Sequence, residues 1–529
     1  MDNTIKENIV NENVASESTM TANRLTEAQI DAIVKGKSVE EVQMAKGDGE
    51  AFAKYGLLSL IFTIVYTICL YRNRMSITYP IFMAITMVLI ALVRKSDNLP
   101  FLRDRNGKLG MNIFYVVSLM LLAISKCMFT SHSLQNLSGL AIFLLFMSFI
   151  MQLYVDTTGW DIAGWIGGIF FTIVRPIEYL PWPFKDFAAW VKDKGSETSK
   201  EKKSAFMAVG LGIVIAIPLL AVVISLLISA DAVFSRVLER AFSEIHLPDN
   251  MLDIVGVAFT LFYGFVCAYI IPNSLSKKKL SISPAKQGNN NPLIAITFTI
   301  LLGIVYLFFC LIQVLFLFTD SMKLPTGYTY AEYAHEGFYQ LLAVCLINVV
   351  LVLICSRAFA KNKLLNIILS VIGACTYIMI ASSAMRMVLY IGVYQLTFLR
   401  LFVLWFLCVL SLWLAFLIVS LYKSNFPVFK AAMVTITVAY LVFAFANPDY
   451  QIAKYDLAHT DSNVSEYESV AQYITETLSP DAAPALKGNK KLLKDLENEV
   501  RYTYPKENYE GIRKFNISYA RAKALFEEN

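Results

Sequence analysis

The sequence predicts an all-α protein, a polytopic bundle of about eleven transmembrane helices with a helical tail at each end. The composition is the first reason: 57% of the 529 residues are hydrophobic and 16% are charged, whereas soluble domains carry about 25% charged residues. The second reason is a series of eleven apolar stretches. The third is the distribution of lysine and arginine among the loops. Together these observations predict an integral membrane protein.

Composition also excludes several classes of function. The net charge of +5 is too small, and too spread among loops, to indicate nucleic-acid binding. The eight cysteines lie in or beside apolar stretches and form no C-x-x-C pair, so neither a zinc site nor a redox dithiol is expected. The first 50 residues are polar and mixed in charge, which excludes a cleavable signal peptide. We expect no metal and no cofactor.

The apolar stretches are long enough to cross a membrane as helices. A bilayer core about 30 Å thick requires about 20 residues in helical form, because lipid offers the backbone no hydrogen-bond partner. The predicted spans cover residues 54–72, 75–93, 109–129, 137–155, 206–230, 251–272, 291–319, 337–356, 364–386, 400–422 and 428–447. Near the end of the third, Lys126 is expected to reach toward an interface.

The loops predict which side each segment faces. If the N-terminus is cytoplasmic, the inner segments carry 25 lysine and arginine residues and the outer segments nine. Positively charged loops stay in the cytoplasm during insertion. The expected topology therefore has residues 1–53 inside, the bundle over 54–447, and residues 448–529 outside.

Three segments outside the spans have features of their own. The tail 1–53 contains two capping-box patterns, Thr26–Gln29 and Ser38–Glu41, which predict a short helical hairpin. It is either a docking module for a cytoplasmic partner or a solvated tail.

The inner loop 156–204 contains four of the six tryptophans and an apolar run too short to span. Because indole rings prefer the headgroup level, this loop should lie in the inner interface. The alternative is a re-entrant loop lining a pathway.

The C-terminal segment 448–529 is predicted to be a small helical domain. Apolar residues recur at helical spacing from Tyr467 to Leu478, and Ser479-Pro480-Asp481 ends that pattern. A second helix is expected over 508–526. These apolar faces need a partner to bury them, which favours a folded domain.

The sequence contains no catalytic motif that we recognise. It has no G-x-x-x-x-G-K-[ST] loop for nucleotide phosphates, and His335-Glu336 lacks the second histidine of a zinc-protease helix. We therefore assign no catalytic residue.

A polar cluster is instead predicted where the later spans meet the outer interface. Its six ionisable members are Asp231, Glu332, His335, Glu336, Arg386 and Arg400. Ionisable groups at a membrane edge need partners, so the two arginines should pair with the acids. The cluster is either a pocket for an anionic or metal-linked ligand, or a proton-coupled gate, or a set of ion pairs that fastens helix ends. The four histidines also fall outside, which suits a sensor of external pH or metal.

Several motifs resemble a bacterial family of polytopic membrane proteins known as a domain of unknown function, the 4153/4173 group. They are Ala230–Phe234, Tyr328–Leu341, Arg386–Arg400, Asn447–Leu457 and Leu478–Leu486, and the resemblance covers about residues 50–486. The family usually has an arginine where this chain has His335 or Glu336, and more often glycine at Gln395. The resemblance implies a bacterial cell membrane and a helical fold, but no activity.

Three functions remain open. The favoured one is a non-catalytic envelope sensor or accessory subunit, whose partners are the bilayer and an envelope ligand or a partner membrane protein. A transporter or lipid exporter is the alternative, although that class places charges deep in the membrane within related halves. A membrane-embedded transferase using a lipid-linked donor is the third. It would need a substantial first outer loop, and here that loop is only Arg72-Asn73-Arg74.

Overall fold

The computed structural model describes residues 47–103, 109–194, 251–277, 288–319, 330–423, 426–460, 464–503 and 511–528, with a few isolated positions such as Asp231. For residues 330–336 it describes the backbone alone. The predicted N-terminal hairpin lies outside the described residues, as does nearly all of the predicted span 206–230. Both therefore stay predictions.

The chain divides into two compact units. The small unit comprises residues 1–56 and 180–235, and the large unit comprises residues 57–179 and 236–529. Within the small unit, α9 (Trp182–Lys194) packs Phe187 against Phe52, with ring centroids 4.9 Å apart. Asp186 of α9 accepts a hydrogen bond from the backbone N–H of Asp48 at 2.7 Å. All further features described here belong to the large unit unless stated otherwise.

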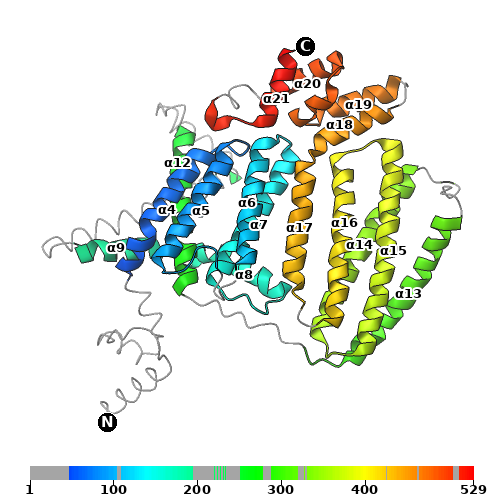
Figure 1. Ribbon diagram of the computed structural model, residues 1–529, viewed down its shortest axis with the longest axis horizontal. Coiled ribbons are helices and arrows are strands. Elements are labelled where there is room, and N and C mark those ends of the chain that lie inside the picture. Colours follow the sequence, from blue (N-terminus) through cyan, green and yellow to red (C-terminus); the bar gives the residue numbers. More distant parts are fainter. Residues whose placement is uncertain are drawn as a thin grey trace, which may run out of the picture. The chain divides into compact units, whose positions relative to one another are not determined.

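Ten helices of the described chain are long and apolar enough to cross a membrane, which confirms a multi-pass membrane protein. They are α4 (Gly49–Leu70), α5 (Thr78–Ser96), α6 (Gly110–Met128), α7 (His132–Tyr154), α12 (Met251–Lys277), α13 (Pro292–Thr319), α14 (Tyr330–Ala358), α15 (Lys363–Tyr394), α16 (Phe398–Tyr422) and α17 (Val428–Phe445). Each coincides with a predicted span, and all ten are drawn in Figure 1. We call the end that carries the C-terminal helices the upper end.

Two helices are longer than their predicted spans. Helix α14 begins at Tyr330 rather than at residue 337, so Glu332, His335 and Glu336 lie on its first two turns. Helix α15 continues past Arg386 to Tyr394. The prediction that Arg386 ends a span was therefore wrong. A single arginine does not stop a helix, because its guanidinium can pack against a neighbouring helix while the backbone ladder continues.

The segment 156–204, predicted to lie in the inner interface, contains one helix of the large unit. Helix α8 (Ile162–Glu178) begins at the N-cap Asp161, whose Oδ1 accepts a hydrogen bond from the N–H of Gly164. It packs against α7, α12 and α17 at the lower end of the bundle. Trp165 is buried and stacks on Phe429 of α17 with ring centroids 4.8 Å apart, whereas Ile166 and Phe170 are exposed. One face of α8 thus joins the bundle core and the other offers apolar side chains.

The C-terminal helices occupy residues 448–528 and pack on one another. They are α18 (Pro448–His459), α19 (Val464–Glu476), the 3₁₀ helix η2 (Pro480–Leu486), α20 (Lys490–Thr503), the 3₁₀ turn η4 (Ile512–Lys514) and α21 (Ile517–Glu527). Ile452, Val470, Leu486, Leu496 and Ala522 form their shared core. Helices were predicted from the sequence near α19 and α21, whereas α18 and α20 were not predicted.

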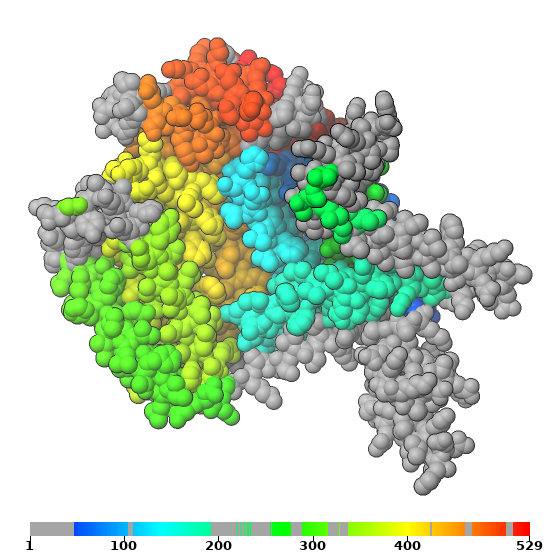
Figure 2. Space-filling model, turned by 180° about the vertical axis from the view of Figure 1, so that it is seen from behind, coloured from blue at the N-terminus to red at the C-terminus, as the bar shows by residue number. Residues whose placement is uncertain are grey.

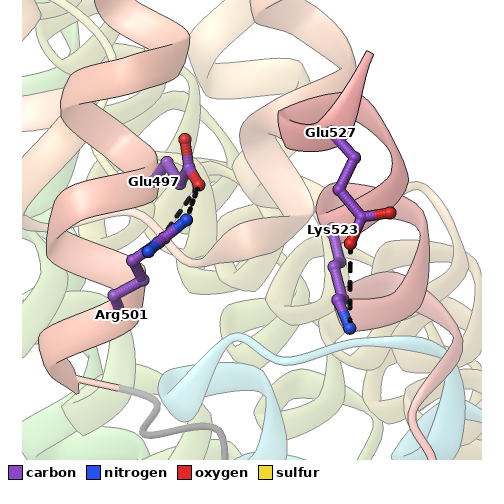
Figure 3. A network of polar contacts seen from close by, with 4 residues as sticks. All are labelled: Glu497, Arg501, Lys523 and Glu527. Atoms are coloured by element: carbon purple, nitrogen blue, oxygen red, sulfur yellow. Dashed lines mark hydrogen bonds and ion pairs between the residues drawn. The ribbon is translucent and has the colours of Figure 1, made fainter. Parts of the chain in front are cut away.

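Ion pairs on the surface of these helices are local. Figure 3 shows Arg501 paired with Glu497 at 2.5 Å on α20, and Lys523 paired with Glu527 at 3.8 Å on α21. Each pair joins residues four apart on a single helix. Such exposed pairs contribute about 0.3–0.5 kcal/mol, so they do not explain how the C-terminal helices are attached to the bundle.

Two charged residues that reach into the bundle are held by backbone carbonyls. Arg94 is buried and donates from Nη1 to the carbonyl of Leu153 at 2.7 Å. Lys126 is also buried and donates to the carbonyl of Gln135 at 2.5 Å. Gln135 lies in the first turn of α7, so Lys126 at the end of α6 has its partner on the neighbouring helix, and its approach to a membrane interface stays a prediction.

Candidate functional site

The six predicted site residues have different positions in the structure. Asp231 is exposed, belongs to the small unit, and accepts a hydrogen bond from the N–H of Val233 at 2.7 Å. The side chains of Glu332, His335 and Glu336 lie outside the described residues. Arg386 and Arg400 are described and lie on α15 and α16. The pairing of these arginines with the three predicted acids stays a prediction.

Arg386 packs directly against the backbone of α14. A Cβ atom added to Gly337 would lie 2.8 Å from Cζ of Arg386 and even closer to its Nη1. Glycine is therefore required at 337 for this approach of the guanidinium. The contact puts Arg386 beside the turn that follows Glu336 in the sequence.

Arg400 closes the turn between α15 and α16. Its Nη1 donates to the carbonyl of Tyr394 at 2.5 Å and also to the carbonyl of Gln395. Its guanidinium lies 4.3 Å from the ring centroid of Tyr390. These contacts are those of a fastening residue, and they hold the backbone of a turn that has an unusual conformation.

That conformation belongs to Gln395. Its φ of 71° and ψ of 172° fall in a region that is essentially restricted to glycine, because a Cβ atom meets the backbone there. A glycine would adopt this conformation without that strain. The next N–H, that of Leu396, donates to Oδ1 of Asp456 at 2.8 Å, which links the turn to α18.

The strongest polar cluster was absent from the predicted site. It consists of buried side chains that tie the C-terminal helices to the upper loops of the bundle, and we call it the polar junction. Its central residues are Asp449, Asp456, Asp481 and Asn516, each no more than 3% exposed. None of the four was chosen from the sequence, although three lie within the quoted motifs.

Asp481 holds the turn between α6 and α7. Its Oδ1 accepts from the N–H of Thr130 at 2.9 Å and from the hydroxyl of Thr130 at 2.7 Å. Its Oδ2 accepts from the N–H of Thr130 at 2.9 Å and of Ser131 at 3.1 Å. Both oxygens of one buried carboxylate are thus directed at backbone donors of a loop about 350 residues earlier in the chain.

Asp449 lies beside Asp481 and is held differently. Its Oδ1 accepts from the hydroxyl of Ser131 at 3.3 Å, and its Oδ2 accepts from the N–H of Ser479 at 3.1 Å. Ser131 therefore contacts both carboxylates. Burial, and then repulsion from Asp481, raise the pKa of Asp449 from 3.8 to about 6. Burial also raises the pKa of Asp481, against the hydrogen bonds from Ser518, Thr130 and Ser131.

Local sequence explains why both carboxylates face inward. Asn447 adopts a left-handed conformation with φ of 54°, accepts from the N–H of Tyr450 as N-cap of α18, and is followed by Pro448 at N1. Ser479 is the N-cap of η2 and is likewise followed by proline. In each case an Asn/Ser-Pro-Asp sequence fixes the start of a helix and sets an aspartate on its first turn. This repeated pattern is the feature of the sequence from which Asp449 and Asp481 could have been chosen as site residues.

Asp456 and Asn516 complete the junction. Burial raises the pKa of Asp456 to about 6, opposed by the Leu396 N–H, Arg400 and His459. Asn516 donates from Nδ2 to the carbonyls of Met75 at 2.8 Å and Phe129 at 3.1 Å. The junction thus contacts the upper loops α4–α5, α6–α7 and α15–α16.

The junction does not offer a metal or cofactor site. Each oxygen of Asp449 and Asp481 already accepts at least one hydrogen bond. Among the residues that the structure describes, no group of three or more His, Cys, Asp or Glu side chains could hold a metal ion. The arrangement can bind a loop and can take up protons.

Comparison with known proteins gives a family but no described function. No curated protein matches the chain significantly, and neither does any solved structure. The family model described as Domain of unknown function (DUF4153) matches residues 116–488, which is more than half of the chain and includes α7, α15–α17, Asp449 and Asp481. The chain therefore belongs to the DUF4153 family of multi-pass membrane proteins.

Proposed function

We propose that this protein is a non-catalytic sensor or accessory subunit of the bacterial cell membrane. In this proposal the C-terminal helices lie outside the cell and bind an envelope ligand or a partner membrane protein. The observation that carries the proposal is the pair of buried carboxylates, because Asp449 and Asp481 connect these helices to the turn between α6 and α7.

The number of attached loops supports a coupling role. Asp481 holds the α6–α7 turn, Asp456 holds the α15–α16 turn, and Asn516 holds both the α4–α5 loop and Phe129. A displacement of the C-terminal helices would therefore pull on six spans through backbone hydrogen bonds. Such coupling requires a two-state element that a ligand can bias, and we assign that role to the junction.

The ligand pocket that we propose lies between α14 and α15 at the upper end. Arg386 contacts α14 at Gly337, and Glu332, His335 and Glu336 are spaced i, i+3 and i+4 on the turns just before it, so that they share a face. Arg400 is the other residue proposed for this pocket, and Asp231, in the small unit, is kept as a separate candidate. Its ligand would be an anion, or a metal-linked group, at the outer membrane face.

The test asks whether loosening the C-terminal helices also loosens the spans that they contact, or whether these helices are only attached to the bundle. Hydrogen exchange of the full chain in nanodiscs would be compared for the native protein and Asp481→Asn, which disrupts the α6–α7 contact. Coupling predicts faster exchange in the upper turns of α6, α7 and α16 as well as in the C-terminal helices. If faster exchange is confined to residues 448–528, the helices are attached without being coupled, and the sensor proposal fails.

The pocket has its own test. Arg386→Lys keeps the charge but loses the planar fork that binds a carboxylate or phosphate at two points. If Arg386 binds a ligand, the Arg386→Lys protein should fail to restore function in a strain that lacks the native protein. Its melting temperature should stay close to that of the native protein. If Arg386→Lys instead restores full function in the deletion strain, Arg386 only packs against α14 and the ligand pocket is contradicted.

A further inference from the structure

A cavity of about 330 Å³ lies at the lower end of the bundle, away from the polar junction. It is enclosed by the start of α8, the end of α14, the end of α16 and the start of α17. Figure 2 shows the turquoise α8 next to the yellow-green end of α14, with part of the orange α17 in the recess between them. The polar side chains that line it are Asp161, Ser356, Arg357 and Ser420.

One wall of the cavity is apolar and open to the side of the bundle. Ile166 of α8 is 61% exposed and Ile354 of α14 is 57% exposed, although both line the cavity. Val350 continues this wall one turn deeper along α14 and is also exposed. Exposed aliphatic side chains on a membrane helix contact acyl chains, so this wall is suited to a hydrocarbon tail rather than to a solute from water.

The other end of the cavity is cationic. Arg357 is exposed and lines both this cavity and a smaller neighbouring one, to which Lys361 and Asn362 also contribute. Lys363 and Lys423 are exposed on the adjoining helix ends. Asp161 is the acidic residue of the lining, and its Oδ1 is engaged by the N–H of Gly164 as the cap of α8. Positive charge therefore predominates around Arg357.

The start of α17 adds a second attraction for an anion. Its first residues, Val428 and Phe429, line the cavity; the N–H of Val428 donates to the carbonyl of Phe426 at 2.9 Å, so the attraction comes from the helix dipole and from the N–H groups that follow. The first N–H groups of a helix lack partners within the helix and carry the positive end of its dipole. Phosphate groups bind readily at such positions.

We propose that this cavity binds an anionic phospholipid. The phosphate lies on Arg357 and the start of α17, a headgroup hydroxyl faces Asp161, and an acyl chain follows Ile166, Ile354 and Val350. Basic pockets between transmembrane helices bind anionic lipid headgroups in this way. The proposal does not depend on the sensor function, because it uses residues at the opposite end of the bundle.

Native mass spectrometry of the full chain, stripped of lipid in mild detergent, tests the proposal with phosphatidylglycerol, phosphatidylethanolamine and phosphatidylcholine as probes. Phosphatidylglycerol should bind in preference to both other lipids, and Arg357→Gln should weaken its binding about tenfold because a charge-assisted contact to phosphate is lost. Lys363→Gln, at the same end but outside the cavity lining, should change it by no more than about twofold. Ala163→Phe, which fills the cavity from α8, should also weaken binding.

Three results would overturn the proposal. Equal loss of binding in Arg357→Gln and Lys363→Gln would show only attraction to surface charge. Equal binding of all three lipids would show an apolar groove without headgroup recognition. Complete displacement of phosphatidylglycerol by excess inorganic phosphate would show a site for a soluble anion.

Discussion

The two carboxylates of the polar junction should respond in opposite ways to the same substitution. In Asp449→Asn, the amide oxygen can accept from the N–H of Ser479 while the amide group donates to the hydroxyl of Ser131, so both contacts survive. In Asp481→Asn, the amide group must face the N–H of Thr130 or Ser131, since both oxygens of Asp481 accept from backbone donors. Asp449→Asn therefore keeps every hydrogen bond of that residue, whereas Asp481→Asn places an NH2 group against a backbone N–H, so that two donors face each other.

The magnitudes follow from the pKa and from the lost hydrogen bonds. Raising the pKa of Asp449 from 3.8 to about 6 means that its ionised form destabilises the folded junction by about 3 kcal/mol above that pH. Asp449→Asn should therefore stabilise the junction by up to about 3 kcal/mol at pH 8. Asp481→Asn should destabilise it by about 3 kcal/mol, because buried donors lose a charged acceptor.

The sign of the pH dependence is fixed by the same shift. The folded junction binds a proton at Asp449 more tightly than the unfolded chain does, so its stability is greatest below about pH 4 and falls as pH rises through about 6. Asp456, whose pKa is also raised to about 6, acts in the same direction. Asp449→Asn should flatten this dependence without removing the part due to Asp456.

Amide hydrogen exchange at Thr130 and Ser131 measures the opening of the junction directly, because both N–H groups donate to Asp481. After correction for intrinsic rates, exchange at pH 8 should slow in Asp449→Asn and accelerate about a hundredfold in Asp481→Asn. Below about pH 4 the Asp449→Asn variant should resemble the native protein, because Asp449 is then protonated in both the closed and the open junction. Faster exchange in both variants at pH 8 would refute the reasoning, since it would mean that ionised Asp449 stabilises the junction.

Three further predictions concern other parts of the fold. Gln395→Gly should raise the melting temperature in detergent, because it relieves about 1 kcal/mol of backbone strain. Gln395→Ala keeps a Cβ atom and should not raise it. Equal increases in the two variants would contradict the assignment to backbone strain. Asn516→Asp keeps the cap of α21 but opposes two carbonyls, so limited proteolysis should release the C-terminal segment faster than in the native chain, and unchanged release would contradict the role of Nδ2. A cysteine at Lys494 should react with an impermeant maleimide from outside the cell and one at Ser276 should not; the reverse pattern would invert the topology.

The labelling prediction has a structural argument beyond the charge count. Gly256 of α12 lies against Tyr71 at the upper end of α4, and Gly264 lies against Thr63 in the middle of α4. Helix α12 therefore runs from the upper end downward, whereas α8 lies at the lower end. Ser276, near the end of α12, therefore lies at the opposite end of the large unit from the C-terminal helices, as the labelling prediction requires.

The spans could be predicted from sequence because each depends on local composition. Ten apolar stretches of membrane length became helices at nearly the expected positions. The polar junction could not be predicted in the same way, because Asp481 finds its donors about 350 residues away. The Asn/Ser-Pro-Asp pattern indicates a helix start, but nothing in it shows which loop the aspartate meets. Arg400 was predicted as a ligand-binding residue from its place at a helix end, but its contacts with the carbonyls of its own turn could not be predicted, because they depend on the conformation of Gln395.

The chemistry of the junction bears on why carboxylates, rather than amides or apolar residues, occupy it. A buried ionised pair is a poor way to gain stability, because desolvation offsets much of the attraction to its donors. Asp449 illustrates this, since an asparagine would satisfy the same two partners without a charge. The native junction is thus held below the stability that its geometry permits at neutral pH. A contact that must open in use benefits from a small free-energy difference between its states, and a sensor attached through Asp449 would open more readily above pH 6 than below it.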